Sequence, residues 1–391
     1  MIASILAASM AAMALTGCGG GKTTSEAQGA TTDETTASTE AGSTADGAEA
    51  PDLNQDTKGT TITFWHSMGG VNGEAMDYLV NKFNEENTDG ITVEAVYQGE
   101  YDDTINKLKS AQIGNMGADL VQIYDIGTRF MIDSGWVIPM QELINADGYD
   151  ISQIEPNIAA YYTVNNELYS MPFNSSTPIL YYNKDMFEQY GLEEPKTLAD
   201  LENICATLKE NGITPFALAN ASKWTGSMYF MSLAARYGGL EPFQNAVAGT
   251  GKFTDDCFIK AGEKIQEWVN NGYFPDGVNS LSEDDGQAKQ LMYQETAGML
   301  LCGSWYTGTF QTDSEEFYQK IGWFPFPAID DSDADPTIQI GTVGDQFISF
   351  NCEGDKLAAA FECATDHLSD EVADITYSNN KIVTCKKMQE T

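Results

Sequence analysis

Segments with the pattern of strands alternate along this chain with segments that have the pattern of helices, and this alternation limits the possible folds most. Residues 61–65 and 91–97 have the composition of strands, and apolar residues recur at helical spacing over 72–86 between them. Another helix is expected before 119–124 (DLVQIY), a mostly apolar segment that predicts a strand buried on both faces. Strands separated by helices indicate an α/β fold built on a sheet.

The same alternation returns in the second half of the chain. Thr197 is placed to cap a helix, and 213–218 and 298–302 follow as strands. A length of 391 residues suits two domains. The sequence therefore predicts two α/β units, with joins near 173–178 and 323–328, and the second join (WFPFP) is expected to be an apolar crossover with two prolines.

The first 17 residues have the properties of a signal peptide. Residues 1–15 are almost wholly apolar but too few to span a bilayer comfortably. Leu15, Thr16, Gly17 and Cys18 form a stretch that resembles the lipobox of bacterial lipoproteins, in which a cysteine is lipidated and becomes the mature N-terminus. We therefore expect a signal peptide over 1–17 and a lipid on Cys18.

Residues 18–58 predict a disordered acidic tether. Gly, Ser, Thr, Ala and acidic residues dominate this segment, and it has almost no bulky apolar side chains to offset the entropy of ordering. A flexible chain of about 40 residues spans roughly 35 Å. The expected location is the extracellular face of a bacterial cell membrane, with the lipid anchor as the only membrane contact.

The charge of the chain excludes two classes of partner. Because 58 acidic residues face 20 basic ones, the formal net charge is −38. Such a chain repels nucleic acid and anionic lipid at long range, so we expect no nucleic-acid partner. An anionic ligand would need a local cationic site.

No recognisable catalytic or metal-binding motif is present in the sequence. The two histidines, His66 and His367, lack zinc-motif neighbours, and the seven cysteines form no CxxC pair. GxSxG, P-loop and dinucleotide-binding patterns are also absent. We therefore expect no metal, no cofactor and no enzyme activity. The many carboxylates leave a glycosidase pair open as an alternative.

Aromatic and polar side chains follow several of the expected strands. Tyr101 follows the second strand, Asp125 the third, and Ser304 and Trp305 come after 298–302. The run 174–177 (NSST) stands at the mouth of an apolar strand. Ligands of open α/β sheets bind outside the carboxyl ends of strands. Aromatic faces stack on sugar C–H groups while hydroxyls and carboxylates bond their OH groups, so these residues favour a sugar or polyol.

Several stretches, taken in order, resemble one known family. They are the lipobox, the acidic tether, ITFWHSMGG, ADLVQIYDIGT, SMPFNSSTPILYYNKDMFEQYGL and PKTLADL. Over about 60–380 they are similar to the family 1 extracellular solute-binding proteins of ABC importers, and FWHSM and PFNSSTPILYYNKD most resemble the branch that binds glycerol 3-phosphate and its diesters. The resemblance implies an α/β fold of the two-lobe, type II periplasmic-binding-protein kind, with a hinge and a ligand cleft between the lobes.

The resemblance also implies how the chain is divided. Lobe 1 is expected to comprise 59–173 and 328–370, and lobe 2 to comprise 174–327 and 371–391. The NSST run would then lie where the chain first crosses between lobes. The distal arginine of the glycerol-phosphate branch would lie beyond Thr391, so the C-terminus is expected to be truncated.

Ligand contacts follow from the resemblance position by position. The matching positions are Tyr101, Asp125, Ser176, Trp224, Ser304 and Gly341, together with Trp305 from the G-x-W strand end of maltodextrin-binding relatives. Asp125 departs from the glutamate typical of the branch, and the tyrosine of its late GYLP stretch has no match in NNKIVT.

The implied function is capture of a sugar or oligosaccharide and its delivery to an ABC permease. Glycerol 3-phosphate or a glycerophosphodiester is the alternative ligand. A monomer is expected, because the chain carries one pair of lobes and one lipid anchor. Two other classes stay open: a surface glycoside hydrolase, which would consume its sugar, and a structural or adhesive lipoprotein, which would bind no small solute.

Overall fold

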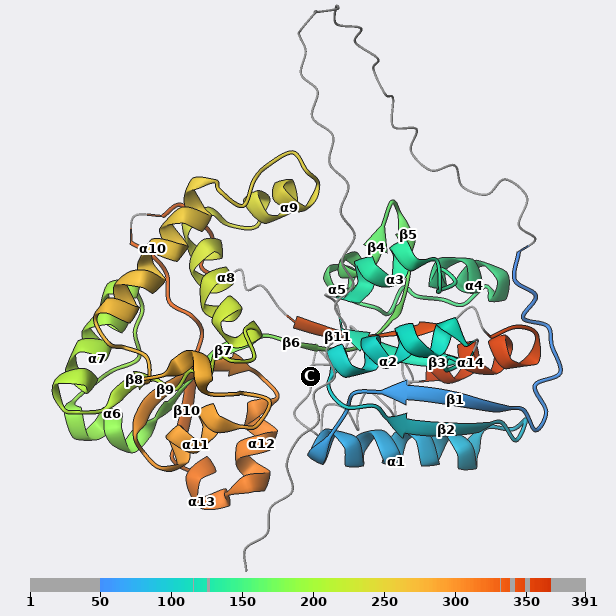
Figure 1. Ribbon diagram of the computed structural model, residues 1–391, viewed down its shortest axis with the longest axis horizontal. Helices are drawn as coiled ribbons and strands as arrows, with labels where there is room; N and C mark the ends of the chain where they lie inside the picture. Colours follow the sequence, from blue (N-terminus) through green and yellow to red (C-terminus); the bar gives the residue numbers. More distant parts are fainter. Residues whose placement is uncertain are drawn as a thin grey trace, which may run out of the picture. The chain divides into compact units, whose positions relative to one another are not determined.

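The computed structural model describes residues 50–114, 116–124, 127–330, 332–337, 342–348 and 352–366 (Figure 1). They form α/β structure with two main sheets, as the alternation predicts. The signal peptide, the lipidation site Cys18, Asp125 and Gly341 lie outside the described residues. The expected lobe bounds and the extent of the tether remain predictions.

The first sheet has five strands in the order β2-β1-β3-β11-β6. β1 (Thr61–His66) pairs in parallel with β2 (Thr92–Tyr97) and with β3 (Leu120–Tyr124). β11 (Thr342–Ile348) is antiparallel to both of its neighbours, β3 and β6 (Met171–Ser176). A strand from late in the chain thus completes a sheet that its first third begins.

Alternating side chains of the first sheet serve two cores, one on each face. Leu120 of β3 belongs to the larger core, whereas Val121 and Ile123 belong to the smaller one, as the two-residue period of a strand requires. α1 (Gly70–Glu86) contributes to the larger core and α2 (Tyr101–Ile113) to the smaller. The other elements of this half are α3 (Thr128–Ser134), α4 (Met140–Asp147), α5 (Pro156–Tyr161), β4 (Thr163–Val164), β5 (Glu167–Leu168) and α14 (Asp355–Asp366).

The second sheet has four strands in the order β10-β7-β9-β8. β7 (Pro178–Asn183) is antiparallel to β9 (Ala297–Gly303) and to β10 (Ile321–Phe324), while β8 (Thr214–Phe216) runs parallel to β9. Every residue of β9 is buried. This matches the nearly unbroken apolar sequence AGMLLCG, which is typical of a strand covered on both faces.

Helices cover both faces of the second sheet. Met299 and Leu301 of β9 face one core and Leu300 and Cys302 face the other. The elements of this half are α6 (Lys184–Tyr190), α7 (Leu198–Glu210), α8 (Trp224–Gly238), α9 (Glu241–Val247), α10 (Asp256–Asn270), η2 (Val278–Ser280), α11 (Gln287–Tyr293), α12 (Tyr306–Asp313) and α13 (Glu315–Tyr318).

The chain passes from the first sheet to the second through one residue. Ser176 ends β6, Pro178 begins β7, and Thr177 alone stands between them. The Thr177 carbonyl accepts a hydrogen bond of 3.0 Å from the backbone N–H of Ser304, just after β9. The NSST run therefore lies at this passage.

One local prediction is wrong. The WFPFP stretch is not wholly a crossover, because Trp323 and Phe324 form the end of β10 and pair with Tyr181 and Leu180 of β7. The two prolines come only after the strand has ended, so they do not interrupt its pairing. Trp323 lies on this edge strand with 63% of its surface exposed.

One other local prediction is confirmed. Thr197 caps α7, where its side chain accepts from the N–H of Asp200 and the Asp200 carboxylate accepts from the N–H of Thr197. The five cysteines in the described part of the chain are free thiols, and Cys363 is the only one of them that is not fully buried. In the described part of the chain, no helix combines the length and apolar character that crossing a bilayer requires.

Candidate functional site

Trp224 and Trp305 lie side by side at the ends of two different elements. Trp224 opens α8, and Trp305 follows β9 directly before α12. Their ring centroids are 6.0 Å apart, with an interplanar angle of 53°. Both side chains are half-buried, so each ring packs on the second sheet and still has surface left for a ligand. The structure thus joins two of the residues singled out in the sequence.

Trp224 is held by the loop that precedes α11. Its indole Nε1–H donates to Asp284 Oδ1 at 3.0 Å. Ser222 Oγ accepts from the backbone N–H groups of Glu283 and Asp284 at 3.0 and 3.2 Å. Lys223, which lies between Ser222 and Trp224 in the chain, has a φ of +63°, a conformation that is uncommon for a residue with a side chain. The backbone therefore turns sharply just where the indole leaves it.

Trp305 is held by the end of β9. A Cβ atom at position 303 would lie 1.8 Å from Cζ3 of Trp305, so the indole packs directly over Gly303 and only glycine fits there. The Tyr181 hydroxyl donates toward the Gly303 and Ser304 carbonyls at 3.3 and 3.2 Å. This packing gives a physical reason for the G-x-W spacing seen in the sequence.

Ser176 and Ser304 lie at the passage between the sheets. Ser176 ends β6, and the next residue, Thr177, accepts the Ser304 N–H. Both serine side chains are half-buried. The structure thus places the two predicted serines at one strand junction, with Trp305 next to Ser304 in the chain.

Tyr101 belongs to the strand ends of the first sheet. It opens α2, and its ring stacks on that of Tyr124 at a centroid distance of 4.9 Å. The Tyr124 hydroxyl in turn donates to Asp102 Oδ1 at 2.7 Å. Tyr101 therefore forms an aromatic pair with Tyr124 in the first half of the fold, whereas Trp224 and Trp305 pair beside the second sheet.

Acidic side chains accompany both aromatic groups. Burial raises the pKa of Glu100, and the nearby charges of Asp284 and Asp103 raise it further. A ligand that contacts these aromatic groups meets carboxylates, which bond sugar hydroxyls and repel anions.

Glu283 and Asp284 contact the residues around the two tryptophans, and the sequence did not single them out. Their segment, SEDDG, is a run of charged and small residues that resembles a solvated loop. Glu283 is only 6% exposed, and the hydroxyl of Tyr306 donates to its Oε1. Burial raises the pKa of Glu283 to about 8, against smaller opposing effects of the Ala288 N–H and the Lys289 ammonium.

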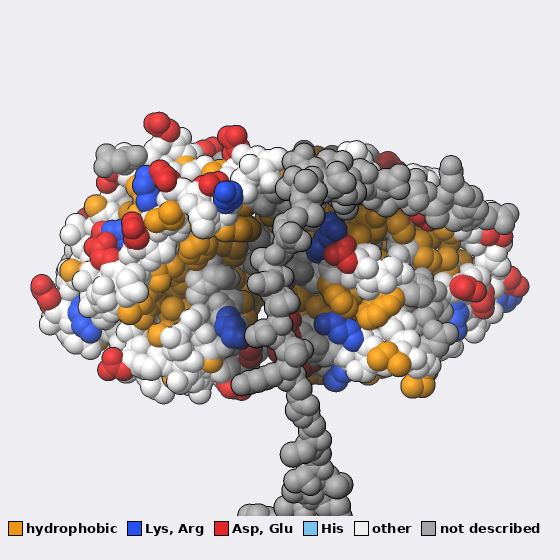
Figure 2. Space-filling view, turned by 45° about the horizontal axis from the view of Figure 1, so that its top comes forward, with side chains coloured by type: hydrophobic (Ala, Val, Ile, Leu, Met, Phe, Trp, Pro, Cys, Tyr) orange, Lys and Arg blue, Asp and Glu red, His pale blue; other side chains and the backbone are white. Residues whose placement is uncertain are grey.

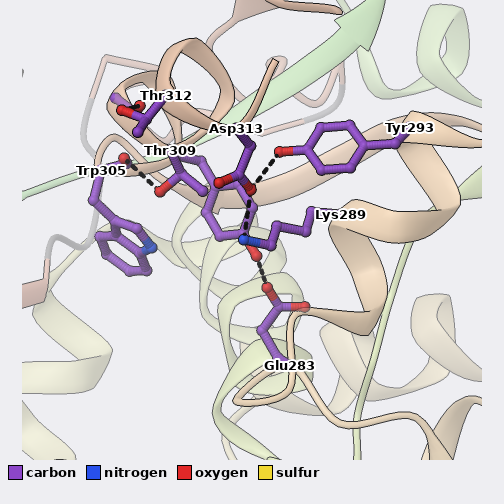
Figure 3. A network of polar contacts seen from close by, with 9 residues as sticks. Glu283, Lys289, Tyr293, Trp305, Thr309, Thr312 and Asp313 are labelled. Atoms are coloured by element: carbon purple, nitrogen blue, oxygen red, sulfur yellow. Dashed lines mark hydrogen bonds and ion pairs between the residues drawn. The ribbon is translucent and has the colours of Figure 1, made fainter. Parts of the chain in front are cut away.

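Lys289 forms an ion pair with Asp313. Its Nζ lies 2.7 Å from Asp313 Oδ2, which also accepts from the Tyr293 hydroxyl at 2.9 Å (Figure 3). On the face of the molecule drawn in Figure 2, many Lys and Arg side chains lie beside acidic ones, and others border apolar surface. That face shows no gathering of cations among the described side chains.

Comparison with known proteins gives this arrangement a family. A model of the family described as "Bacterial extracellular solute-binding protein" matches residues 69–365. The sn-glycerol-3-phosphate-binding periplasmic protein UgpB of Shigella flexneri is 32% identical over 296 residues, which are 72% of this chain and 64% of that protein. The matched part of this chain thus spans less than two thirds of that relative's length.

Solved structures show the same architecture. A structure from a study of xylan utilization by Caldanaerobius polysaccharolyticus has 28% identity and a TM-score of 0.72, covering 84% of this chain and 83% of that one. Maltose-bound MalE3 of T. maritima has 16% identity and a TM-score of 0.69, covering 85% and 83%, and shows the fold alone. This chain has the two-lobe α/β fold of these binding proteins, and it belongs to the family of bacterial extracellular solute-binding proteins.

Proposed function

We propose that this protein captures a sugar or short oligosaccharide outside the membrane and delivers it to the permease of an ABC importer. The observation that carries the proposal is the half-exposed Trp224–Trp305 pair with the Asp284 carboxylate on its edge. Aromatic faces bind the C–H surface of a sugar, and a carboxylate accepts hydrogen bonds from its hydroxyls.

The charges near these residues favour a neutral ligand over an anionic one. Glu100, Asp102 and Asp103 surround Tyr101 in sequence, and Asp284 bonds Trp224. The alternative, a glycerol phosphate, rests on the 32% identity to a protein named for that ligand. A phosphate at this place would need a cation to offset the carboxylates.

Tyr101, Ser176, Trp224, Ser304 and Trp305 are the proposed ligand contacts among the described residues. Asp125 and Gly341 are proposed on the resemblance alone. Ligand contacts to both lobes would favour a closed form by differential affinity, and the closed form would dock on the permease. No covalent chemistry is needed, so we propose that the protein is not an enzyme.

A calorimetric and thermal-shift panel tests the ligand class. The full chain is titrated with xylotriose, maltotriose, triacetylchitotriose, glycerol 3-phosphate and glycerophosphocholine. A ligand at a hundred times its Kd is expected to add about 2.7 kcal/mol of stability. Binding of neutral sugars alone supports the proposal, and binding of only the phosphates would replace it with the alternative. A bound sugar that is hydrolysed on prolonged incubation would establish the glycosidase instead.

We also propose that Cys18 carries a lipid and that the protein is a monomer at the outer face of the membrane. The lipobox-like sequence before Cys18 supports the first statement. Metabolic labelling with an alkyne fatty acid is expected to mark the wild-type chain and not Cys18→Ala. Equal labelling of both chains would refute the lipid anchor.

A further inference from the structure

We infer that the loop residues Glu283 and Asp284 position the Trp224–Trp305 pair for ligand binding, each by holding one aromatic side chain. The inference rests on the proposed function, because it assigns a role at the proposed sugar site. Neither residue belongs to a motif, and both come from the 282–285 loop before α11.

Backbone hydrogen bonds first fix this loop against the entry to α8. Asn220 N–H donates to Val278 O at 2.9 Å, and Ala221 N–H donates to Leu281 O at 2.8 Å. Ser222 Oγ then accepts from both loop N–H groups, as described above. The two segments are about 60 residues apart in sequence yet joined at successive positions, so a change in one is transmitted to the other.

Asp284 determines where the Trp224 ring points. The indole has one N–H, and its acceptor is Oδ1 of Asp284. Asp284 itself is exposed, and Trp224 is half-buried. A hydrogen bond at such an exposed place adds little to the stability of the fold, but it favours one orientation of the ring.

Glu283 acts on the other tryptophan through its neighbour. Tyr306, which follows Trp305 in the chain, is 5% exposed and donates to Glu283 Oε1. The Trp305 carbonyl accepts from Thr309 Oγ1 at 3.4 Å, within the first turn of α12 (Figure 3). Glu283 thus anchors the beginning of α12, from which the Trp305 ring extends.

Several titratable groups face Glu283. Tyr306 bonds it, and Asp284 and Lys289 act on its pKa with opposite signs. Burial raises the pKa of Tyr229 on α8 and of Cys302 on β9, and the charge of Glu283 acts in the same direction on both groups.

The test compares Asp284→Ala with Asp284→Asn in the full chain. Asparagine retains an oxygen that accepts the indole N–H, whereas alanine does not. We expect Asp284→Ala to weaken binding of the sugars in the panel about tenfold in Kd and Asp284→Asn to restore most of that loss. Equal Kd values for Asp284→Ala and the wild type would overturn the inference. Equal losses of sugar affinity in Asp284→Ala and Asp284→Asn would overturn it too, because the negative charge rather than the hydrogen bond would then matter.

Glu202→Ala is the matched control. Glu202 accepts from the indole N–H of Trp268 at 2.8 Å, which is the same kind of bond made by a fully buried tryptophan of the core on which Trp224 also packs. This variant is expected to unfold more easily and to bind sugar with unchanged Kd. A lower sugar affinity in Glu202→Ala would mean that any loss of stability weakens binding, and the Asp284 result would then not support positioning.

A measurement without ligand separates this inference from the proposed function. Near-ultraviolet circular dichroism reports the coupling of the two indoles. The signal lost in Trp224→Phe is expected to be lost in Asp284→Ala and kept in Asp284→Asn. If the wild type binds none of the sugars but the signal follows this pattern, the proposed function fails and the positioning stands. An unchanged signal in Asp284→Ala refutes the positioning whatever the ligand.

Discussion

Two tryptophans in the second half of the chain make the same hydrogen bond in opposite surroundings. Trp268 is fully buried and donates to Glu202 at 2.8 Å, and Lys264 bonds the same carboxylate oxygen at 2.8 Å. Trp224 is half-buried and donates to the exposed Asp284 at 3.0 Å. The difference lies in what covers the ring: protein covers Trp268 completely, whereas Trp224 keeps surface for another molecule. The first bond serves the fold, and the second serves the proposed site.

The largest expected effect is that of Trp268→Ala on stability. Removing a large, fully buried side chain typically costs about 3–5 kcal/mol of unfolding free energy, because it loses apolar burial and leaves a cavity. Urea unfolding followed by far-ultraviolet circular dichroism measures this loss. Trp224→Ala, the paired variant, is expected to be nearly as stable as the wild type but to bind sugar more weakly. Similar stability losses in the two variants would erase the distinction between the two rings.

Glu202→Ala is expected to lower the free energy of unfolding by about 1.5–3 kcal/mol, the range for hydrogen bonds to charged groups. The substitution leaves the buried Trp268 N–H without its acceptor and removes one of the two carboxylates that bond Lys264. Glu202→Gln keeps an acceptor for the indole and should recover part of the loss. A fully stable Glu202→Ala protein would show that this bond is dispensable even in the core.

Glu283→Gln is expected to flatten the dependence of stability on pH. Folding raises the pKa of the Glu283 carboxyl from 4.5 to about 8. This carboxyl therefore ionises at a lower pH in the unfolded chain than in the folded chain. Its contribution is therefore fully present below pH 4.5 and is lost as pH rises toward 8. Glutamine cannot ionise, so the stability of the wild type relative to the variant should fall across this window. Parallel pH profiles of the two proteins would show that Glu283 does not titrate there.

The smallest expected effect is that of Thr197→Ala. Thr197 caps α7, the helix that carries Glu202, and loss of a side-chain cap typically costs about 1 kcal/mol. Thermal unfolding measures the change, and Thr197→Ser should retain the cap. Sugar affinity is expected to stay at the wild-type value, because Thr197, like Glu202 and Trp268, is expected to stabilise the fold and not to act in binding. A marked change in Kd would connect α7 to the binding site.

What the sequence predicted well is local in origin. The β1, β2 and β3 strands follow from composition over a few residues, and the Thr197 cap from a T-x-x-D pattern that closes on itself. Ser304 and Trp305 were singled out because they follow a segment predicted to be a buried strand, and β9 is that strand; their contact with a ligand stays a prediction. Trp224 came from the family resemblance, and the structure then placed it against Trp305.

What the sequence missed depends on distant partners. Glu283 is buried because Tyr306 lies against it, 23 positions along the chain, and nothing in SEDDG signals that contact. The end of β10 was read as a crossover because its pairing with β7 joins residues about 140 positions apart, and only the prolines after it are local. The spacing of hydrophobic residues and the residue types typical of turns carry no information about contacts between residues so far apart in the sequence.

The single-residue passage at Thr177 restricts how the backbone can rotate there. Pro178 fixes its own φ near about −65° and excludes the helical region for the residue before it, so Thr177 is confined to extended conformations. The bond from the Ser304 N–H to the Thr177 carbonyl resists turning of the same peptide unit. With so few free torsions, this strand link acts as a stiff joint, and a large rotation of one sheet relative to the other could draw little on the dihedral angles of Thr177.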